Sequence, residues 1–353
     1  MENDSIKFKT HKFNISIEEL ENHESNGLDA SWLKLLFSGS DINVKIINAI
    51  RRVSMNNIPT YAFPQELITI DTNTTVAFNN DYMRLRLSQL PVLGVDTNTY
   101  YLNEKYYEKI NFADLKRPKH PNEKMVELYF NVHNNSANIT NVTTDDCIVT
   151  VDGEQISPYS KEYPILLIKL RPNDRFKCHM KAVFGVGDKH VIWSGARNAF
   201  YDEITDKNTD EKNGFLCEFT IEGNQQCHEY EILIRACRYL IKKLTMLKEE
   251  MKSKITKKII LPEKIIHFKL DGEDHSIGEI INYQFQDHKN IISSGMGKPD
   301  QLIKSILIKI TASSTVESPL DAMLESIDIV IAKYEHIGKL LEDMSSKKPK
   351  KTK

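Results

Sequence analysis

Residues 265–288 read IIHFKLDGEDHSIGEIINYQFQDH, and they carry the signals of a strand followed by a helix. The first six are mostly apolar, and the Asp-Gly pair that follows them is typical of a turn. Ser276 and Glu279 fit a capping box, in which each side chain satisfies a free backbone N–H at the start of a helix. We therefore predict a strand at 265–270, a turn at 271–274 and a helix at 275–288.

The residues on either side complete a small α+β unit. We predict a strand at 303–311 and a closing helix at 319–343, which has apolar residues at helical spacing. Such a stripe along one side of a helix is usually a packing face. Pro262 opens the unit, and the charged stretch 248–258 before it is typical of a junction. These boundaries predict a rear domain at 262–344.

An earlier part of the chain repeats the same order of elements. A strand predicted at 32–37 is followed by a helix at 41–57, and a long helix is predicted at 228–250. Even a short run is shared, since Ile-Ile-Asn occurs at 46–48 and again at 280–282. Internal repetition of this kind implies a pseudo-two-fold packing of the two units.

We predict an α+β fold in which two units, each an antiparallel sheet with two helices, pack as an intramolecular pseudo-dimer. The apolar stripes of the two long helices would bury each other, together with the two shorter helices. The residues predicted to form this internal seam are Ile46, Ile50, Leu240, Leu244, Ile280, Ile327 and Tyr334.

The middle of the chain has a different composition. Residues 94–160 are rich in Asn, Thr, Tyr and Asp, with short alternating apolar runs, which indicates an inserted β-rich domain. Further strands are predicted at 62–71, 81–93, 165–170, 176–184 and 214–222. The predicted domains are a surface extension at 1–30, a front domain at 31–93 and 161–255, the insert at 94–160, the rear domain at 262–344 and a disordered basic tail at 345–353.

Bulk composition argues against several classes of protein. The 353 residues have a formal net charge of −2, so we do not expect a chain that coats nucleic acid through its overall field. No apolar run approaches the roughly 18 residues of a membrane helix, and the polar start does not resemble a secretory signal. With five cysteines, we expect free thiols in a reducing, intracellular compartment.

The sequence does not show the motifs that a catalytic or metal-binding site would need. Gly185-Val186-Gly187 begins a dinucleotide fingerprint, but His190 stands where the third glycine would be. Cys217, Cys227 and Cys237 are spaced ten apart without a Cys-x-x-Cys partner, which does not fit a zinc site. We therefore expect no active site of the chain's own, no metal and no cofactor.

Four residues remain as candidates for contacts with other proteins. Arg51 and Arg52 end the first predicted helix, where a structural role beside the helix C-terminus explains one of them. Adjacent helical side chains point roughly 100° apart, so at least one arginine should face outward. His190 and Trp193 lie in a loop, and the simplest interpretation is a loop histidine beside a tryptophan that anchors the loop to a core.

Several of these segments resemble the α-like assembly subunits of multisubunit DNA-dependent RNA polymerases. Residues 48–53 (NAIRRV) and 58–62 (IPTYA) resemble the family's Asn-Ala-Leu-Arg-Arg helix and Ile-Pro-Thr turn. Residues 86–92 (RLSQLPV) resemble its Arg-Ile-Gly-Leu-Ile-Pro-Leu strand, and 185–194 (GVGDKHVIWS) its Gly-x-Gly-x-x-His-Ala-Lys-Trp-Ser loop. In the rear unit, 273–281 (EDHSIGEII) is similar to the Glu-Asp-His-Thr-Leu-Gly-Asn-Leu-Leu signature of the smaller subunit.

The resemblance implies a third-subunit type fused to an eleventh-subunit type, as in large cytoplasmic DNA viruses. The resemblance implies a non-catalytic scaffold that recruits the second-largest and largest polymerase subunits. It implies no homo-oligomer and no binding to a membrane. Such a chain contacts DNA only through the complex, at a cytoplasmic replication site and in the virion. From their positions in the matching motifs, the resemblance implies that four residues contact the large subunits: Arg51, Arg52, His190 and Trp193.

The chain departs from the family pattern at several positions. The lysine and proline of the family's loop are Ile192 and Gly195 here, which puts one charged contact in doubt. The strand glycine is Ser88, and the Pro-His-Pro turn of the smaller subunit is reduced at 298–300. Zinc-binding cysteine clusters of some relatives are missing from 94–160, so no zinc is expected there.

Two other functions stay open at this point. A free-standing nucleic-acid-binding adaptor would use the basic run at 347–353, although such runs are more often solvated chain ends. An enzyme with an unrecognised site in the insert would need clustered ionisable groups, and the sequence shows only scattered Asp, Glu and Tyr there.

Overall fold

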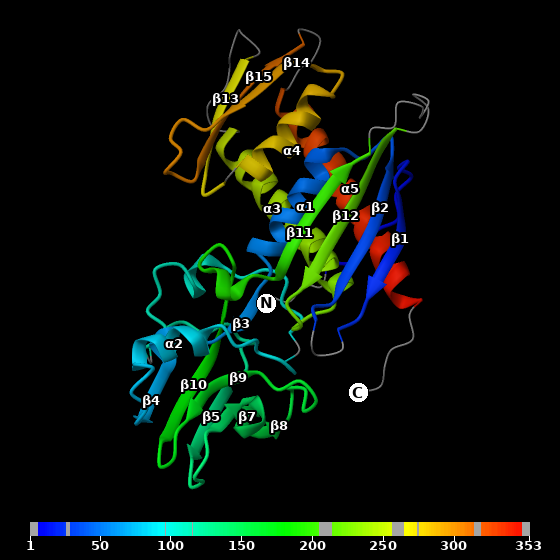
Figure 1. Cartoon of the computed structure of the whole chain (residues 1–353). Coiled ribbons are helices and arrows are strands. Elements are labelled where there is room, and N and C mark those ends of the chain that lie inside the picture. Colours follow the sequence, from blue (N-terminus) through cyan, green and yellow to red (C-terminus); the bar gives the residue numbers. More distant parts are fainter. Residues whose placement is uncertain are drawn as a thin grey trace.

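The computed structural model describes residues 6–25, 29–95, 97–114, 116–204, 214–255, 265–273, 275–313 and 319–347. It is a mixed α+β structure with antiparallel sheets and five α-helices in these ranges (Figure 1). Of the predicted basic tail, only residues 345–347 fall among the described residues, and the rest of that prediction lies outside them.

The front sheet has four antiparallel strands in the order β1-β2-β12-β11. Buried and less buried residues alternate along β2, with Leu33, Leu35 and Phe37 on the inner face, because successive side chains in a strand point to opposite sides. That face packs on two helices. The elements are β1 (Ser16–His23), β2 (Trp32–Gly39), β11 (Ala196–Glu203), β12 (Phe215–Gly223), α1 (Val44–Asn56) and α3 (Glu229–Ile255).

The prediction of a mere surface extension at 1–30 is wrong for its described residues. Strand β1 pairs with β2 at the edge of the front sheet, where a strand needs only one apolar face and can be mostly polar. The segment before it packs on the closing helix. There Phe8 lies so close to Gly338 that a Cβ at this glycine would be 2.4 Å from the ring.

The rear sheet has three antiparallel strands in the order β13-β15-β14. Along β15, Ile306, Ile308 and Ile310 are buried and alternate with exposed residues, so one face of this sheet is also covered. The elements are β13 (Ile265–Asp271), α4 (His275–Gln286), β14 (Ile291–Gly297), β15 (Ser305–Ala312) and α5 (Pro319–Ser346).

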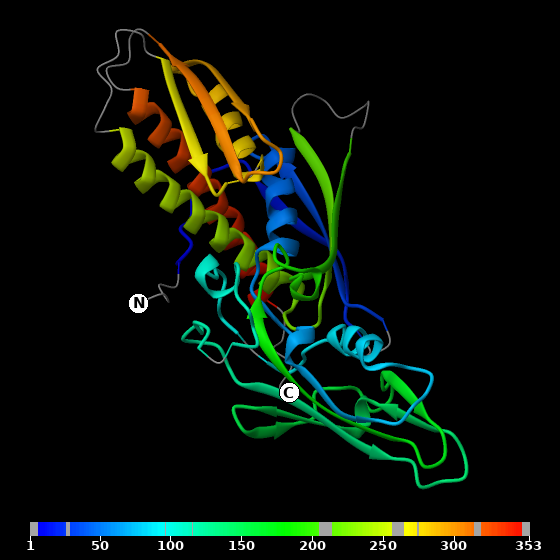
Figure 2. The ribbon, with the colours of Figure 1, turned by 90° about the vertical axis from the view of Figure 1, so that its left-hand side faces the viewer.

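Four helices from the two parts of the chain lie together between the two sheets. The long helices α3 and α5 run side by side, α1 contacts α3 and α4, and α4 contacts α5 (Figure 2). Their apolar residues form one continuous cluster with the inner faces of both sheets. The seven residues named in the sequence for the internal seam all lie in this cluster and are 0–3% exposed.

A second core lies at the other end of the molecule (Figure 1). It draws on residues from Tyr61 to Val186, so it extends beyond the predicted insert at 94–160 on both sides. One sheet has the order β3-β10-β5-β7-β8, with β4 also paired to β10, and β6 pairs with β9. The strands are β3 (Thr60–Ala62), β4 (Ile68–Asn73), β5 (Val126–His133), β6 (Thr140–Thr143), β7 (Cys147–Val151), β8 (Glu154–Ile156), β9 (Leu166–Leu170) and β10 (Arg175–Gly185).

The strand predicted at 81–93 is wrong. Helix α2 (Asn80–Ser88) occupies its first part, and Asn79 caps it by accepting a hydrogen bond of 2.8 Å from the Tyr82 backbone N–H. Met83 and Leu87 are both buried, and their spacing of four places them on one side of a helix. The apolar spacing and the cap therefore favour a helix over the predicted strand.

The shared core predicts a contrast between two apolar side chains of α3. We expect Leu240→Ala to lower the free energy of unfolding by about 2–5 kcal/mol, because Leu240 is fully buried in the helical seam and its loss leaves a cavity. Met246→Ala is the matched control, since Met246 is 43% exposed and should change stability by about 0.5 kcal/mol or less. Equal effects in urea unfolding would show that the seam is not packed as described.

Candidate functional site

The C-terminal end of α1 is covered by the loop at 185–196. A helix leaves its last four carbonyl groups without partners inside the helix. Here the loop supplies the donors: the Asp188 N–H donates to the Asn56 carbonyl at 2.8 Å, and the Gly195 N–H donates to the Met55 carbonyl at 3.0 Å. The Ser194 hydroxyl also donates to the Met55 carbonyl, at 3.0 Å. The loop is therefore a cap for α1.

Two glycines of this loop allow the close approach. A Cβ at Gly187 would lie 2.5 Å from the Met55 carbonyl oxygen, and one at Gly195 would lie 2.4 Å from the Ser54 carbonyl oxygen. No larger residue fits at either position without moving the backbone of α1. The glycine spacing that resembled a dinucleotide fingerprint thus has a structural cause, which is the docking of the loop on a helix end.

Trp193 anchors the loop from inside. It is 2% exposed, its indole N–H donates to the Val183 carbonyl at 2.9 Å, and its ring fills the space that a Cβ at Gly185 would need. The Phe112 ring lies 5.2 Å away between centroids. Within this chain the buried side chain therefore anchors the loop, as the simplest interpretation of the sequence predicted, and a contact of Trp193 with another subunit stays a prediction.

The exposed tip of the loop is formed by other residues. His190 is exposed, and its Nδ1 accepts a hydrogen bond of 3.3 Å from the Ile192 N–H, so the imidazole fixes the turn that follows it. Val191 beside it is 71% exposed. Of the four predicted contact residues, His190 is the one presented most openly to solvent.

The two arginines at the end of α1 have different surroundings. Both are half-buried, and the Arg51 Nε donates to Asn48 Oδ1 of the same helix at 3.0 Å. Arg52 instead lines a small pocket of about 90 Å³ that also includes Asp188 of the loop. The structure thus brings Arg52 and the loop to one place, while Arg51 and His190 lie outside that pocket.

The same pocket contains an ion pair between the front and rear parts of the chain. Lys243 of α3 and Glu273, which precedes α4, are 2.7 Å apart and each side chain is only 16% exposed. Burial raises the pKa of Glu273, since the carboxylate loses water. Burial opposes the charge on Lys243 as well, but the attraction of Glu273 outweighs it and raises the pKa of the amine.

A second ion pair at this place joins Lys304, in the turn before β15, to Asp188. Lys243 and Lys304 were not predicted as site residues. No local sequence pattern relates them to their partners Glu273 and Asp188, which are distant in the sequence. Glu273 was visible only as the first residue of the EDHSIGEII signature, and its neighbour Asp274 lies outside the described residues.

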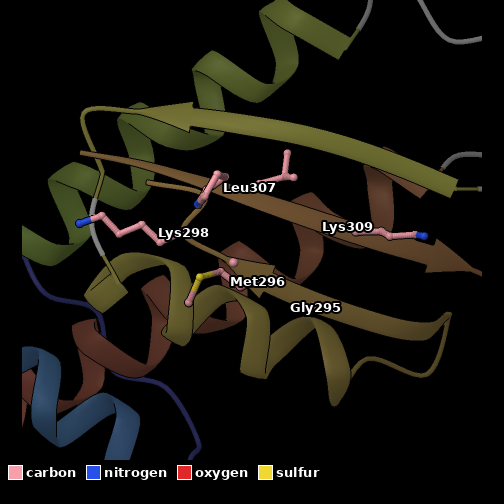
Figure 3. Close-up of a pocket in the computed structure, with 7 residues that line it drawn as sticks. Gly295, Met296, Lys298, Leu307 and Lys309 are labelled. Carbon is pink, nitrogen blue, oxygen red and sulfur yellow. The ribbon is translucent and has the colours of Figure 1, made fainter. Parts of the chain in front are cut away.

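Two further concave surfaces lie outside this place. A cleft of about 1070 Å³ lies between the second core and the start of α3. A shallow groove of about 330 Å³ runs over β14 and β15, where Lys298 and Lys309 lie at opposite ends with Leu307 and Met296 between them (Figure 3). Within the described residues, no three His, Cys, Asp or Glu side chains converge in a way that could hold a metal ion.

Three of the five cysteines, Cys178, Cys217 and Cys237, are buried packing residues. None of the five, all of which lie among the described residues, forms a disulfide, and burial raises the pKa of Cys237 and of Cys178 to about 12, so neither is a reactive thiolate near neutral pH. No helix among the described residues has the length and apolar character needed to cross a membrane.

The loop geometry predicts a contrast between two glycines. We expect Gly187→Ala to lower the free energy of unfolding by about 1–3 kcal/mol, because the new methyl group collides with the end of α1. Gly295→Ala on β14 is the control, since a Cβ there meets nothing within 4 Å. Thermal unfolding compares the two, and equal stability of both variants would contradict the docking of the loop.

Comparison with known proteins identifies RNA polymerase subunits, although no protein-family model matches the chain. A protein of Acanthamoeba polyphaga mimivirus, described as a DNA-directed RNA polymerase subunit, is 26% identical over 330 residues, 88% of this chain and 90% of that protein. RNA polymerase II subunit rpb3 of Dictyostelium discoideum is 24% identical over 195 residues, 50% of this chain and 61% of that subunit. RNA polymerase subunit Rpo11 of Sulfurisphaera tokodaii is 26% identical over 84 residues, 24% of this chain and 86% of that subunit.

The chain is therefore similar along most of its length to a viral polymerase subunit, and over shorter stretches to subunits of the third and eleventh types. It spans about half to three-fifths of the third-subunit relatives. The chain is a homologue of the non-catalytic α-like assembly subunits of DNA-directed RNA polymerase, with the larger and the smaller type joined in one polypeptide.

Proposed function

We propose that the chain is a complete α-like platform, an intramolecular pseudo-dimer on which the second-largest and largest polymerase subunits assemble. The observation that carries this proposal is the single hydrophobic core that the front and rear parts share. Residues such as Leu240 from α3 and Ile327 from α5 are fully buried in it. Neither part alone would keep these side chains from water, and that exposure costs roughly 1.5–3 kcal/mol for each side chain.

Joining both parts in one chain favours the pairing. A linker replaces the encounter of two separate subunits by an effective concentration of order millimolar, so the pair forms whatever the expression level. The front sheet, the rear sheet and their four helices would be the dimerisation domains. The second core, drawn from residues 61–186, would be the domain inserted in the front one.

The proposed contact surface is the end of α1 together with its cap. Arg51, Arg52 and His190 are the proposed contacts, since each is at least partly exposed and lies on a rigid support. That support is the docking of the loop through Gly187, Gly195 and Trp193. An arginine at such a site offers five donors in a fixed fork to carboxylates or backbone carbonyls.

The chain would act in an intracellular, reducing compartment with the rest of the polymerase, which fits five cysteines that form no disulfide among the described residues. The basic run at 347–353, which a nucleic-acid-binding adaptor would use, lies outside the described residues except for Lys347.

We expect Arg52→Ala to weaken capture of the second-largest subunit by about 1–3 kcal/mol, because truncation removes charged hydrogen bonds from a supported surface. Arg84→Ala in α2 is the control, since Arg84 pairs with Asp81 at 2.9 Å on a different part of the molecule. The measurement is co-purification of the two large subunits with the tagged full-length chain.

Two results of this experiment would count against different claims. If the unsubstituted chain captures neither large subunit, the proposed function is wrong. If it captures both and Arg52→Ala captures them equally well, the function stands and the assignment of the contact surface fails.

A further inference from the structure

We propose that Lys304 and Glu273, in the rear part of the chain, are positioning residues for the loop at 185–196 in the front part. This inference rests on the proposed function, since the loop is the proposed contact with a large subunit. Neither residue would touch that subunit. Each would act by holding the loop and its surroundings in the geometry that the partner meets.

The first step is the contact between Lys304 and the loop. Asp188 is fixed at its backbone, because its N–H donates to the Asn56 carbonyl at the end of α1. Its side chain points to the rear part and forms an ion pair with Lys304. The loop is therefore held from two sides, by α1 through the backbone and by the rear part through a charge.

The second step is that the two rear residues lie on coupled turns. The Gly272 N–H donates to the Lys304 carbonyl at 2.7 Å, which ties the turn after β13 to the turn before β15. Gly272 has a φ of +80°, a conformation that favours glycine. Glu273 follows directly and pairs with Lys243 of α3. The two turns therefore contact the front part through two ion pairs, one to Asp188 and one to Lys243.

The third step is that residues of the second core meet at the same place. Glu104 and Tyr107 line the pocket that contains Arg52, Asp188, Lys243, Glu273 and Lys304. The Tyr101 ring lies 5.7 Å from the ring of Tyr239 on α3, measured between centroids. Charges of both signs from three parts of the chain therefore converge beside the end of α1, and we call this place the three-way junction.

The degree of burial ranks the two ion pairs. The Lys304 and Asp188 side chains are 58% and 36% exposed, so water screens their attraction and the expected effect of breaking the pair is only about two- to fivefold in an equilibrium. Lys243 and Glu273 are much less exposed, so removing one charge leaves its partner buried without compensation. The second change should have the larger effect.

The test compares five variants of the full-length chain. Lys304→Glu breaks the exposed pair, Asp188→Lys breaks it from the other side, and the combination of both restores a pair of opposite sign. Lys309→Glu is the matched control, because Lys309 is an exposed lysine on β15 of the same rear sheet. Glu273→Lys tests the buried pair.

The first measurement is hydrogen exchange of the Asp188 and Gly195 amides in the free chain, because these amides hold the loop on α1. We expect exchange about two- to fivefold faster in Lys304→Glu and Asp188→Lys, a return toward the original rate in the combined variant, and no change in Lys309→Glu. Glu273→Lys should give the largest increase. Unchanged exchange in Lys304→Glu and Glu273→Lys would overturn the proposal.

The second measurement is capture of the second-largest subunit by the same variants. Capture should fall in Lys304→Glu and recover in the combined variant, whereas a merely local disturbance would not be repaired by the reversed pair. Capture that stays constant while exchange rises would also contradict a positioning role. If the unsubstituted chain captures no polymerase subunit, the proposed function fails, and the exchange rates alone decide whether the junction holds the loop.

Discussion

The burial of the α3 and α5 apolar faces against each other is the constraint on which the rest of the structure depends. The two helices are 27 and 28 residues long, and Leu240, Ile327 and Tyr334 are fully buried between them. An apolar stripe along a helix of this length is not stable when it is exposed to water. Each helix therefore needs the other helix, or another partner, to cover its stripe. With both in one chain, the front and rear sheets are placed on either side of a common helical layer, and each sheet covers it with one face.

A second level of organisation depends on this layer. Helix α1 packs on α3 and α4, so its position is set by the seam, and the loop at 185–196 is set in turn by the carbonyl groups at the end of α1. The glycines and Trp193 of the loop are explained by this docking, not by chemistry on a bound molecule. The resemblance associates the loop surface with contacts to other subunits. The position of that surface is therefore set by the packing of α1 on the helical seam.

The features predictable from sequence were the ones encoded locally. The seam residues follow from helical spacing within single segments, and the turn after β13 follows from its Asp-Gly pair, whereas strand β14 of the rear part was not predicted. Helix α2 was misassigned to a strand because the Met83 and Leu87 spacing was not weighed against the apolar run that follows it. Strand β1 was missed because an edge strand with one apolar face looks polar. The pairing of Lys243 with Glu273 could not be found, since no local pattern relates them. The anchoring role of Trp193 was predicted, but its contacts with Gly185 and Phe112 were not, because these residues are distant in the sequence or unrelated by any local pattern.

The central claim is that the front and rear parts pack on each other within one molecule. It is tested most directly by introducing a protease site between residues 255 and 265, cutting the purified chain there and measuring the mass of the products in solution without denaturant. The structure predicts that the two pieces stay together with the mass of one intact chain, because the seam and not the linker holds them. Two pieces that separate, or that each pair with a copy of themselves, would contradict it.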